Sequence, residues 1–377
     1  MSDRSRARSE TVRRGAGLAA AALLALGLGT ACEPAGAGGE GGGTASADAA
    51  MSAGADTVAA ADTVYSVETQ QLAIREWGVP WSETRPRDPY VRRADRAWFV
   101  GQQGNYLALL DPATGRMARY DLPEGTGPHN LIVAPDSTVW FAGNRDAYIG
   151  ELDPATGEVT RHAMPDPDAV DPHTLVFDGQ GDIWFTVQGG NFVGKLDTDA
   201  DSAAVELIEV PTENARPYGI KVDSDGRPWI ALLGTNKLAT VDPSTMELRE
   251  IELPREDAHP RRLDILSDGT IWYVDYVQGY LGRYDPASGD FEEWRSPSGQ
   301  EARPYGMIVD GRDRVWFVET GPDPNVFVGF DPGTGEFVSQ TPVPSGGGTV
   351  RHMHYFAPED EIWFGADTNT VGRVTLK

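Results

Sequence analysis

Seven tryptophans recur at a nearly constant interval along this chain, and that period constrains its fold more than any other feature. The intervals between them are 42, 44, 45, 43, 44 and 47 residues, for Trp98, Trp140, Trp184, Trp229, Trp272, Trp316 and Trp363. Each tryptophan lies in a short run rich in β-branched and aromatic residues, as in a strand. A period in the forties is typical of β-propeller blades, which contain four strands each.

The repeating unit is clearest between residues 303 and 344, where Gly, Pro and Asp interrupt short apolar runs. The pattern predicts four strands there, at Tyr305–Val309, Val315–Glu319, Val326–Phe330 and Glu336–Thr341. A second marker, Asp-Pro-Ala-Thr-Gly or a relative of it, recurs with the same period and begins at Asp111, Asp153, Asp242, Asp285 and Asp331. We expect this marker to form the tight turn between the third and fourth strands.

The two ends of the repeat region predict how the ring closes. After Trp363 the chain has room for a second and a third strand (Val371–Leu376), so the last unit lacks its fourth strand. The segment Leu72–Pro80 resembles the fourth strands of the other units. We therefore predict an all-β, seven-bladed β-propeller over residues 71–377. Its last blade is closed by the N-terminal strand, which removes the open sheet edges.

The first 70 residues do not belong to this repeat. Residues 1–31 combine a basic start with a small apolar segment, Gly15–Gly29, and predict a lipoprotein-type signal peptide with lipidation of Cys32. Ordinary signal cleavage, an accidental cysteine and twin-arginine export through Arg13 and Arg14 are the alternatives. Residues 32–70 are rich in Ala and Gly and predict a flexible tether. We expect an exported protein of the cell envelope, lipid-anchored at the periplasmic or cell surface.

The charge of the chain restricts its partners. Its formal net charge is −25. An acidic protein of this kind is repelled by nucleic acid and by anionic lipid, so we expect neither as a partner. We expect the lipid anchor to be the only membrane contact, and the domain to be a monomer.

One position in each unit combines rings and guanidinium groups. It lies eleven residues before the tryptophan, where the innermost strand begins, and it is occupied by Arg87, His129, His173, Tyr218, Arg261, Tyr305 and His352. The alternating direction of blade strands places these residues together on one face, near the axis. Arg216, Arg303, Arg351 and His354 add positive charge around the same mouth. We predict a pocket there for a small molecule or cyclic peptide that is anionic or carbonyl-rich.

The position three residues after the tryptophan lies on the same face and carries acids in only two units, as Asp275 and Glu319. These carboxylates are candidate metal ligands, because hard divalent cations prefer oxygen donors. Ion pairing with the neighbouring arginines is the alternative.

The repeats also resemble a known family. The segments GPHNLIVAPDSTVWFAGN (residues 127–144) and ARPYGMIVDGRDRVWFVE (residues 302–319) resemble the virginiamycin B lyase, or streptogramin lyase, family. The resemblance covers residues 72–377. It implies a seven-bladed propeller that opens the lactone ester of a cyclic depsipeptide antibiotic by elimination, with Mg²⁺ as cofactor.

The resemblance assigns site residues one by one. It implies that His352 is the general base, and His354 is a second candidate for that role. Tyr305 stands where the family has another histidine, and Ala366 and Val350 stand where it has glutamates. Asp275 and Glu319 could rebuild a metal site nearby.

Three functions follow as hypotheses. The first is a lyase-like enzyme that uses His352, with Tyr305 or an arginine polarising the ester carbonyl. The second is a membrane-tethered propeller that binds its ligand through Arg87, His129, His173, Tyr218, Arg261 and Arg303 without chemistry. The third is a lactonase-like hydrolase on the same fold.

Overall fold

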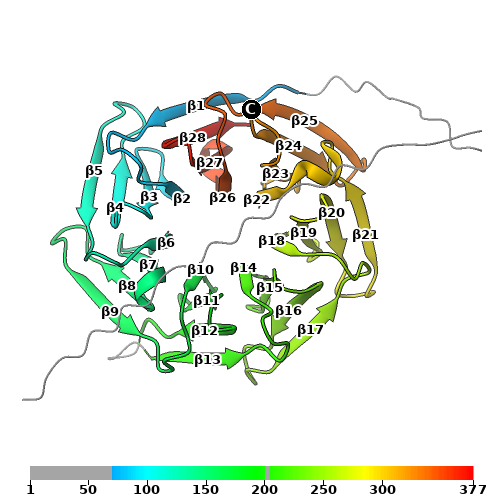
Figure 1. Cartoon of the computed structure of the whole chain (residues 1–377), viewed down its shortest axis with the longest axis horizontal. Coiled ribbons are helices and arrows are strands. Elements are labelled where there is room, and N and C mark those ends of the chain that lie inside the picture. Colours follow the sequence, from blue (N-terminus) through cyan, green and yellow to red (C-terminus); the bar gives the residue numbers. More distant parts are fainter. Residues whose placement is uncertain (1–69, 200–203, 377) are drawn as a thin grey trace, which may run out of the picture. The chain divides into compact units, whose positions relative to one another are not determined.

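Seven four-stranded antiparallel sheets surround a central axis in the computed structural model of the chain (Figure 1). The structure describes residues 70–199 and 204–376. The predicted seven-bladed, all-β propeller is therefore confirmed. The predicted signal peptide, lipidated Cys32 and all but the last residue of the tether lie outside the described residues.

Blades one to six each contain four consecutive strands, ordered from the axis outward. Blades one to three comprise β2 (Pro86–Arg93), β3 (Arg96–Gly101), β4 (Tyr106–Leu110), β5 (Met117–Asp121); β6 (Pro128–Val133), β7 (Val139–Gly143), β8 (Tyr148–Leu152), β9 (Val159–Ala163); β10 (Pro172–Phe177), β11 (Ile183–Val187), β12 (Phe192–Leu196), β13 (Val205–Glu209). Blades four to six comprise β14 (Pro217–Val222), β15 (Pro228–Leu232), β16 (Lys237–Val241), β17 (Leu248–Glu252); β18 (Pro260–Ile265), β19 (Ile271–Asp275), β20 (Tyr280–Tyr284), β21 (Phe291–Arg295); β22 (Pro304–Val309), β23 (Val315–Glu319), β24 (Val326–Asp331), β25 (Glu336–Pro342). The described residues also contain three short 3₁₀ helices, η1 (Asn144–Asp146), η2 (Gly299–Ala302) and η3 (Ala357–Glu359).

The seventh blade joins the two ends of the ring. It contains β26 (Val350–Phe356), β27 (Glu361–Ala366), β28 (Thr370–Thr375) and, outermost, β1 (Ala73–Gly78). In Figure 1, β1 lies beside β28 at the top of the ring. The two strands pair antiparallel from Ala73 opposite Thr375 to Gly78 opposite Thr370. The predicted closure by the N-terminal strand is confirmed.

The strands of the clearest repeat match their predicted positions to within one residue at each end, as β22 to β25. The repeated Asp-Pro-x-Thr-Gly marker forms the turn between the third and fourth strands, as predicted. In blade one the Gly115 amide donates to the Asp111 carbonyl at 2.8 Å. The Asp111 carboxylate accepts from the Ala113 amide at 2.9 Å, which explains why Asp recurs at this position.

The periodic tryptophans join neighbouring blades. Trp98 of blade one is 6% exposed and packs against Leu131, Val133 and Phe141 of blade two. The other six tryptophans of the series are also buried. Each blade thus covers an apolar face of the next, so no blade is stable alone.

The closing contact requires one glycine. A Cβ on Gly365 of β27 would lie 2.6 Å from the Cα of Arg87 in β2. That distance is too short for any side chain, so blade seven can approach blade one only with glycine there.

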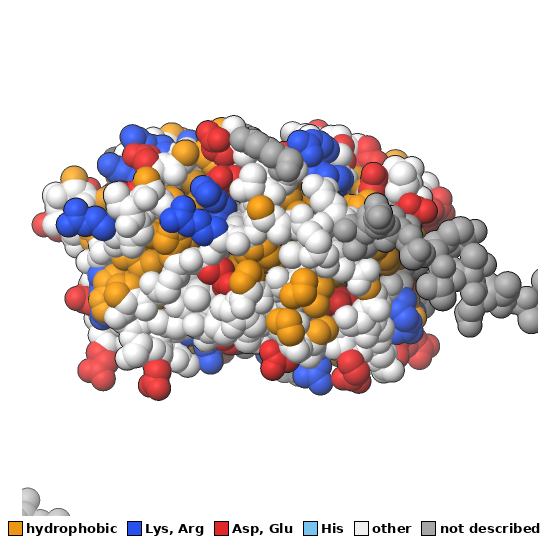
Figure 2. Space-filling model, turned by 90° about the horizontal axis from the view of Figure 1, so that it is seen from above, with side chains coloured by type: hydrophobic (Ala, Val, Ile, Leu, Met, Phe, Trp, Pro, Cys, Tyr) orange, Lys and Arg blue, Asp and Glu red, His pale blue; other side chains and the backbone are white. Residues whose placement is uncertain are grey.

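The described residues contain no helix long and apolar enough to cross a membrane. On the side of the propeller seen in Figure 2, Asp and Glu side chains are interspersed with Arg and Lys. Charges of both signs are therefore mixed on this side of the propeller rather than gathered in one patch.

We expect Trp77→Ala to destabilise the closed ring. The Trp77 ring lies 5.5 Å from the Trp363 ring and nearly parallel to it, and Trp77 is 7% exposed. Removing a buried tryptophan side chain costs about 3–5 kcal/mol, because a cavity remains. Chemical denaturation measures the loss. Arg116→Met is the control, because Arg116 is exposed and lies outside blade seven. An unchanged unfolding midpoint for Trp77→Ala would contradict this account of closure.

Candidate functional site

The innermost strand of each blade brings one polar side chain to the axis. In blades one to six a proline begins this strand, and the next residue forms what we call the axial ring. The pairing register between first and second strands identifies its members as Arg87, His129, His173, Tyr218, Arg261, Tyr305 and Arg351. Six of these seven residues are the ones that the tryptophan spacing predicts.

The seventh prediction is wrong by one residue. In blade six, Met307 pairs with Phe317, the residue after the tryptophan. In blade seven, Met353 pairs with the equivalent Phe364, and the connection through η3 is one residue longer. Counting back from the tryptophan therefore misses the ring position. Arg351 occupies it, and His352 lies one residue further along β26.

Aromatic rings contact one another, in tilted pairs, around half of the axial ring. The ring centroids of His129 and His173 are 3.6 Å apart, and those of His173 and Tyr218 are 3.9 Å apart. The hydroxyl groups of Tyr218 and Tyr305 form a hydrogen bond. The guanidinium carbon of Arg261 lies 3.6 Å from the centroid of the Tyr305 ring, a cation–π contact. The structure thus brings these five predicted residues together, in contact with one another.

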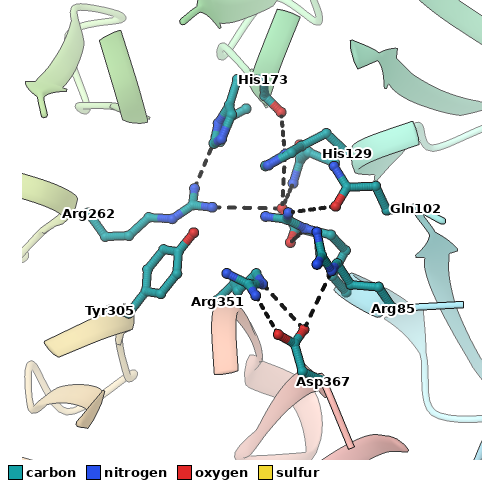
Figure 3. A network of polar contacts seen from close by, with 12 residues as sticks. Arg85, Gln102, His129, His173, Arg262, Tyr305, Arg351 and Asp367 are labelled. Carbon is teal, nitrogen blue, oxygen red and sulfur yellow. Dashed lines mark hydrogen bonds and ion pairs between the residues drawn. The ribbon is translucent and has the colours of Figure 1, made fainter. Parts of the chain in front are cut away.

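A buried carboxylate completes the axis opposite this arc. Asp88 Oδ1 accepts from Arg87 Nε at 2.9 Å, and its Oδ2 accepts from the side-chain amide of Asn130 at 3.0 Å. Arg262 Nη2 lies 3.8 Å from the same Oδ2. Figure 3 shows Arg262, His129 and Gln102 converging on the axis. His129 Nδ1 lies 3.9 Å from Asp88 Oδ2, and Gln102 accepts from Arg87 at 3.2 Å. Asp88 is fully buried and has φ of +48°, a strained conformation for a residue with a Cβ.

These partners are residues that the sequence analysis missed. Asp88, Asn130, Thr174 and Arg262 all occupy the position directly after the axial ring, in four different blades. Thr174 Oγ1 accepts from Arg262 Nη1 at 3.0 Å and contacts His173 Nδ1 at 2.8 Å. The sequence does contain a signal for them: the residue directly after the axial-ring position is also polar in these four repeats.

Burial keeps the axial histidines neutral. It lowers the pKa of His129 and of His173 well below the usual value, and nearby arginines lower both further. It does the same to His352, although the Asp88 carboxylate opposes the shift. A neutral His352 can accept a proton, but only as a weak base at neutral pH.

The two tyrosines shift in opposite directions. Burial raises the pKa of the Tyr218 phenol, and the neighbouring Tyr305 raises it further. Burial also opposes ionisation of Tyr305, but Arg261, Arg87 and other arginines outweigh it and lower its pKa to about 8. The pKa of Tyr305 is therefore shifted towards neutral pH, whereas those of the axial histidines are shifted away from it.

Four arginines line the entry to the axis on this face, and we call Arg85, Arg216, Arg303 and Arg351 the arginine mouth. Arg85, Arg216 and Arg303 each precede an inner-strand proline and have φ near +50°. That backbone favours glycine, as at the equivalent Gly127, so local conformation does not explain the arginines.

The arginine mouth is only partly neutralised. Arg351 donates to both oxygens of Asp367, and Arg85 lies 4.0 Å from that carboxylate (Figure 3). Arg303 lies 3.7 Å from the exposed Glu301. Burial lowers the pKa of Arg85, and repulsion from Arg351 adds to the shift. This crowding of like charges on an acidic protein attracts anions.

His354 does not belong to this mouth, so the prediction that it adds charge there is wrong. It lies towards the other end of β26, in a cavity of about 600 Å³ whose lining includes Tyr90, Lys221 and Asp264. Its Nε2 lies 2.9 Å from the Val91 carbonyl. Burial lowers its pKa to about 4, so it carries no charge at neutral pH.

The two candidate metal ligands already have partners within the chain. Asp275 is fully buried and accepts from Arg255 Nη2 at 2.6 Å and from the His259 amide at 3.1 Å. Glu319 accepts from the amide and hydroxyl of Ser298. Burial raises the pKa of Glu319, which disfavours the ionised form that a cation needs.

The described residues do not fit Mg²⁺ at this face. Among residues 70–199 and 204–376, no group of three or more His, Cys, Asp or Glu side chains is arranged to hold a metal ion. Arginines surround the one axial carboxylate, Asp88, and repel a cation. The resemblance implied a metal that these residues do not supply.

The fold and axial site define a seven-bladed propeller with a basic, aromatic axis. The sequence model of the Virginiamycin B lyase family matches residues 72–374, and the chain belongs to this family. No curated protein sequence matches it.

Solved structures with the same fold differ in what they do. Virginiamycin B lyase from Staphylococcus aureus superposes with a TM-score of 0.73 at 22% identity, over 81% of this chain and 100% of the lyase. A catalytically inactive histidine-to-alanine variant of that lyase, solved with quinupristin, gives the same values. The extracellular domain of a hybrid two-component system from B. thetaiotaomicron has a TM-score of 0.62 at 15% identity, over 81% of this chain and 43% of that chain. At these identities the likeness shows the fold alone.

We expect Tyr305 to give a phenolate signal near pH 8. The folded protein ionises this phenol more easily than the unfolded chain does, because Arg261 and Arg87 stabilise the anion. It therefore adds stability as the pH rises from about 8 to 10 and adds none below pH 8. Absorbance at 295 nm, compared with Tyr305→Phe, measures the titration. Arg261→Met should raise the pKa of Tyr305, whereas the exposed Arg116→Met should leave it unchanged. A Tyr305 that titrates at pH 10 would refute this electrostatic account.

Proposed function

We propose that the arginine mouth binds a small molecule or cyclic peptide through carboxylate or carbonyl groups of that ligand. The observation that supports this most is the presence of four arginines at one entry of a chain whose net charge is −25. Guanidinium groups bind carboxylates through paired N–H donors, and they also donate to carbonyl oxygens.

The ligand competes with the intramolecular acids of the mouth. Arg351 is bound to Asp367, and its guanidinium also lies 5.9 Å from the centroid of the Tyr305 ring. A carboxylate at the mouth would exchange with Asp367 for this guanidinium. The same movement would open the way to Tyr305, which is 1% exposed.

A second candidate function is elimination at the same site, and the axial acid–base chemistry favours it. His352 Nδ1 is buried and has no hydrogen-bond partner, and Tyr305 titrates near pH 8. The Tyr305 phenolate would be the base, in place of His352, because its pKa is shifted towards neutral pH. The quinupristin complex of a related lyase supports a cyclic peptide ester as the substrate class.

Such an elimination balances without a metal. The base takes a proton from the carbon next to the one that bears the ester oxygen. The electron pair forms a carbon–carbon double bond, and the carbon–oxygen bond breaks. The leaving group is a carboxylate, whose charge Arg261 or Arg351 would stabilise. A lactonase reaction would instead need an activated water, for which these residues offer no metal site.

We expect quinupristin to bind the purified protein, and the binding to weaken about tenfold in Arg351→Met, because one charged hydrogen-bonding group is lost. Isothermal titration calorimetry measures the affinity. Arg116→Met, which removes an exposed charge from the outer turn of blade one, should bind as the wild type does.

Mass spectrometry of the same mixtures separates binding from chemistry. An isomeric, ring-opened product formed without Mg²⁺ and lost in Tyr305→Phe would establish elimination. A product heavier by one water would establish hydrolysis. Unchanged quinupristin with measurable affinity supports the binding function alone, and neither affinity nor product would overturn the proposal for this ligand class.

We also propose that the protein is exported and held in the cell envelope by a lipid on Cys32. The support is the sequence pattern around that residue, together with propeller relatives that are extracellular domains. We expect Cys32→Ala to move the protein from the membrane fraction to the soluble fraction without changing its melting temperature. Cell fractionation after palmitate labelling measures both the location and the lipid. Unchanged membrane association would contradict the anchor.

A further inference from the structure

Unpartnered donors concentrate at the propeller axis. Among the described residues, ten buried side-chain nitrogen or oxygen atoms have no hydrogen-bond partner. Five of these ten belong to four axial residues, namely Arg87, Arg261, Arg262 and His352. Buried polar groups are nearly always satisfied in native proteins, so a cluster of orphaned donors indicates a missing acceptor.

The two most buried of these arginines surround Asp88. Arg87 is 4% exposed and uses Nε for Asp88 and Nη1 for Gln102, which leaves Nη2 free. Arg262 is 3% exposed, and its Nη1 donates to Thr174, which leaves Nε and Nη2 free. At 3.8 Å, Arg262 Nη2 is too far from Asp88 Oδ2 for a hydrogen bond. Each guanidinium therefore presents a donor that nothing in the described chain accepts.

The charges at the axis do not balance. Arg87, Arg261 and Arg262 carry three positive charges, and Asp88 carries the one carboxylate among them. His129, His173 and His352 are neutral because burial lowers their pKa. A buried charge without a partner is strongly destabilising.

We propose that a small oxyanion, of the carboxylate or phosphate type, binds at the axis between Arg87 and Arg262. Arg87 Nη2 and Arg262 Nη2 donate to it, and His352 Nδ1 donates a third hydrogen bond when that nitrogen carries the ring proton. The anion supplies the missing acceptor and offsets one of the two excess charges. Planar guanidinium groups suit carboxylate and phosphate equally.

This anion site uses different arginines from the proposed ligand site, although His352 also belongs to the proposed elimination chemistry. The arginine mouth consists of Arg85, Arg216, Arg303 and Arg351, and none of them contributes a donor to the axial anion site. The anion stabilises the folded axis whether or not a ligand occupies the mouth. Failure of quinupristin binding would therefore leave this inference intact.

The test compares melting temperatures of the purified protein in sodium HEPES, to which acetate or phosphate is added at constant ionic strength. We expect a saturable rise of about 5 °C at a hundredfold excess over Kd, because the anion binds only the folded state. The more effective anion identifies the oxyanion class. Arg262→Met should abolish the rise, and the exposed Arg116→Met should preserve it.

Two measurements on the wild type keep the test decisive if Arg262→Met does not fold. Added anion should raise the pKa of Tyr305, followed at 295 nm, because it neutralises part of the arginine charge. Ion chromatography of denatured protein detects an anion that remains bound through purification. One equivalent released would support a tightly held anion. A flat melting curve with no anion released, or an equal rise in Arg262→Met, would overturn the proposal.

Discussion

The contact between neighbouring blades through a buried tryptophan is the interaction on which this propeller depends. Trp98 illustrates it, since it belongs to blade one and packs among Leu131, Val133 and Phe141 of blade two. Because each blade buries its face only against the next, the seven sheets must form a complete ring to be stable. The complete ring holds the seven inner strands around a common axis. The side chains of the axial ring therefore lie close enough to contact one another.

The convergence of inner strands sets the chemistry of the axis. Arginines placed within a few ångströms of tyrosines and one carboxylate stack on rings, and they hold the pKa of Tyr305 near 8 despite its burial. The same crowding leaves buried donors without acceptors and repels a cation from Asp88. The chain belongs to the virginiamycin B lyase family, and its propeller fold is also found in extracellular domains of two-component systems, so function has to be argued from the charged axis rather than from the fold.

Periodicity explains both what the sequence predicts and what it misses. Features that repeat once per blade can be predicted from the spacing of the tryptophans. They include the inner strands and six of the seven residues of the axial ring. His352 was misplaced because the connection through η3 is one residue longer than its equivalents. The partners of Asp275 and Glu319 are Arg255 and Ser298, which lie in loops that do not repeat. Asp88 was not predicted because two of its partners, Asn130 and Arg262, belong to other blades.

Closure by β1 has a consequence for the order of events during biosynthesis. Ala73 is among the first propeller residues to be made, whereas its partner Thr375 is nearly the last. The seventh sheet therefore stays incomplete until β28 has been made, and blades one to six exist only as an open arc before then. Long-range pairing of this kind makes folding slow. The chain thus reaches its closed, stable form only after β28 can pair with β1.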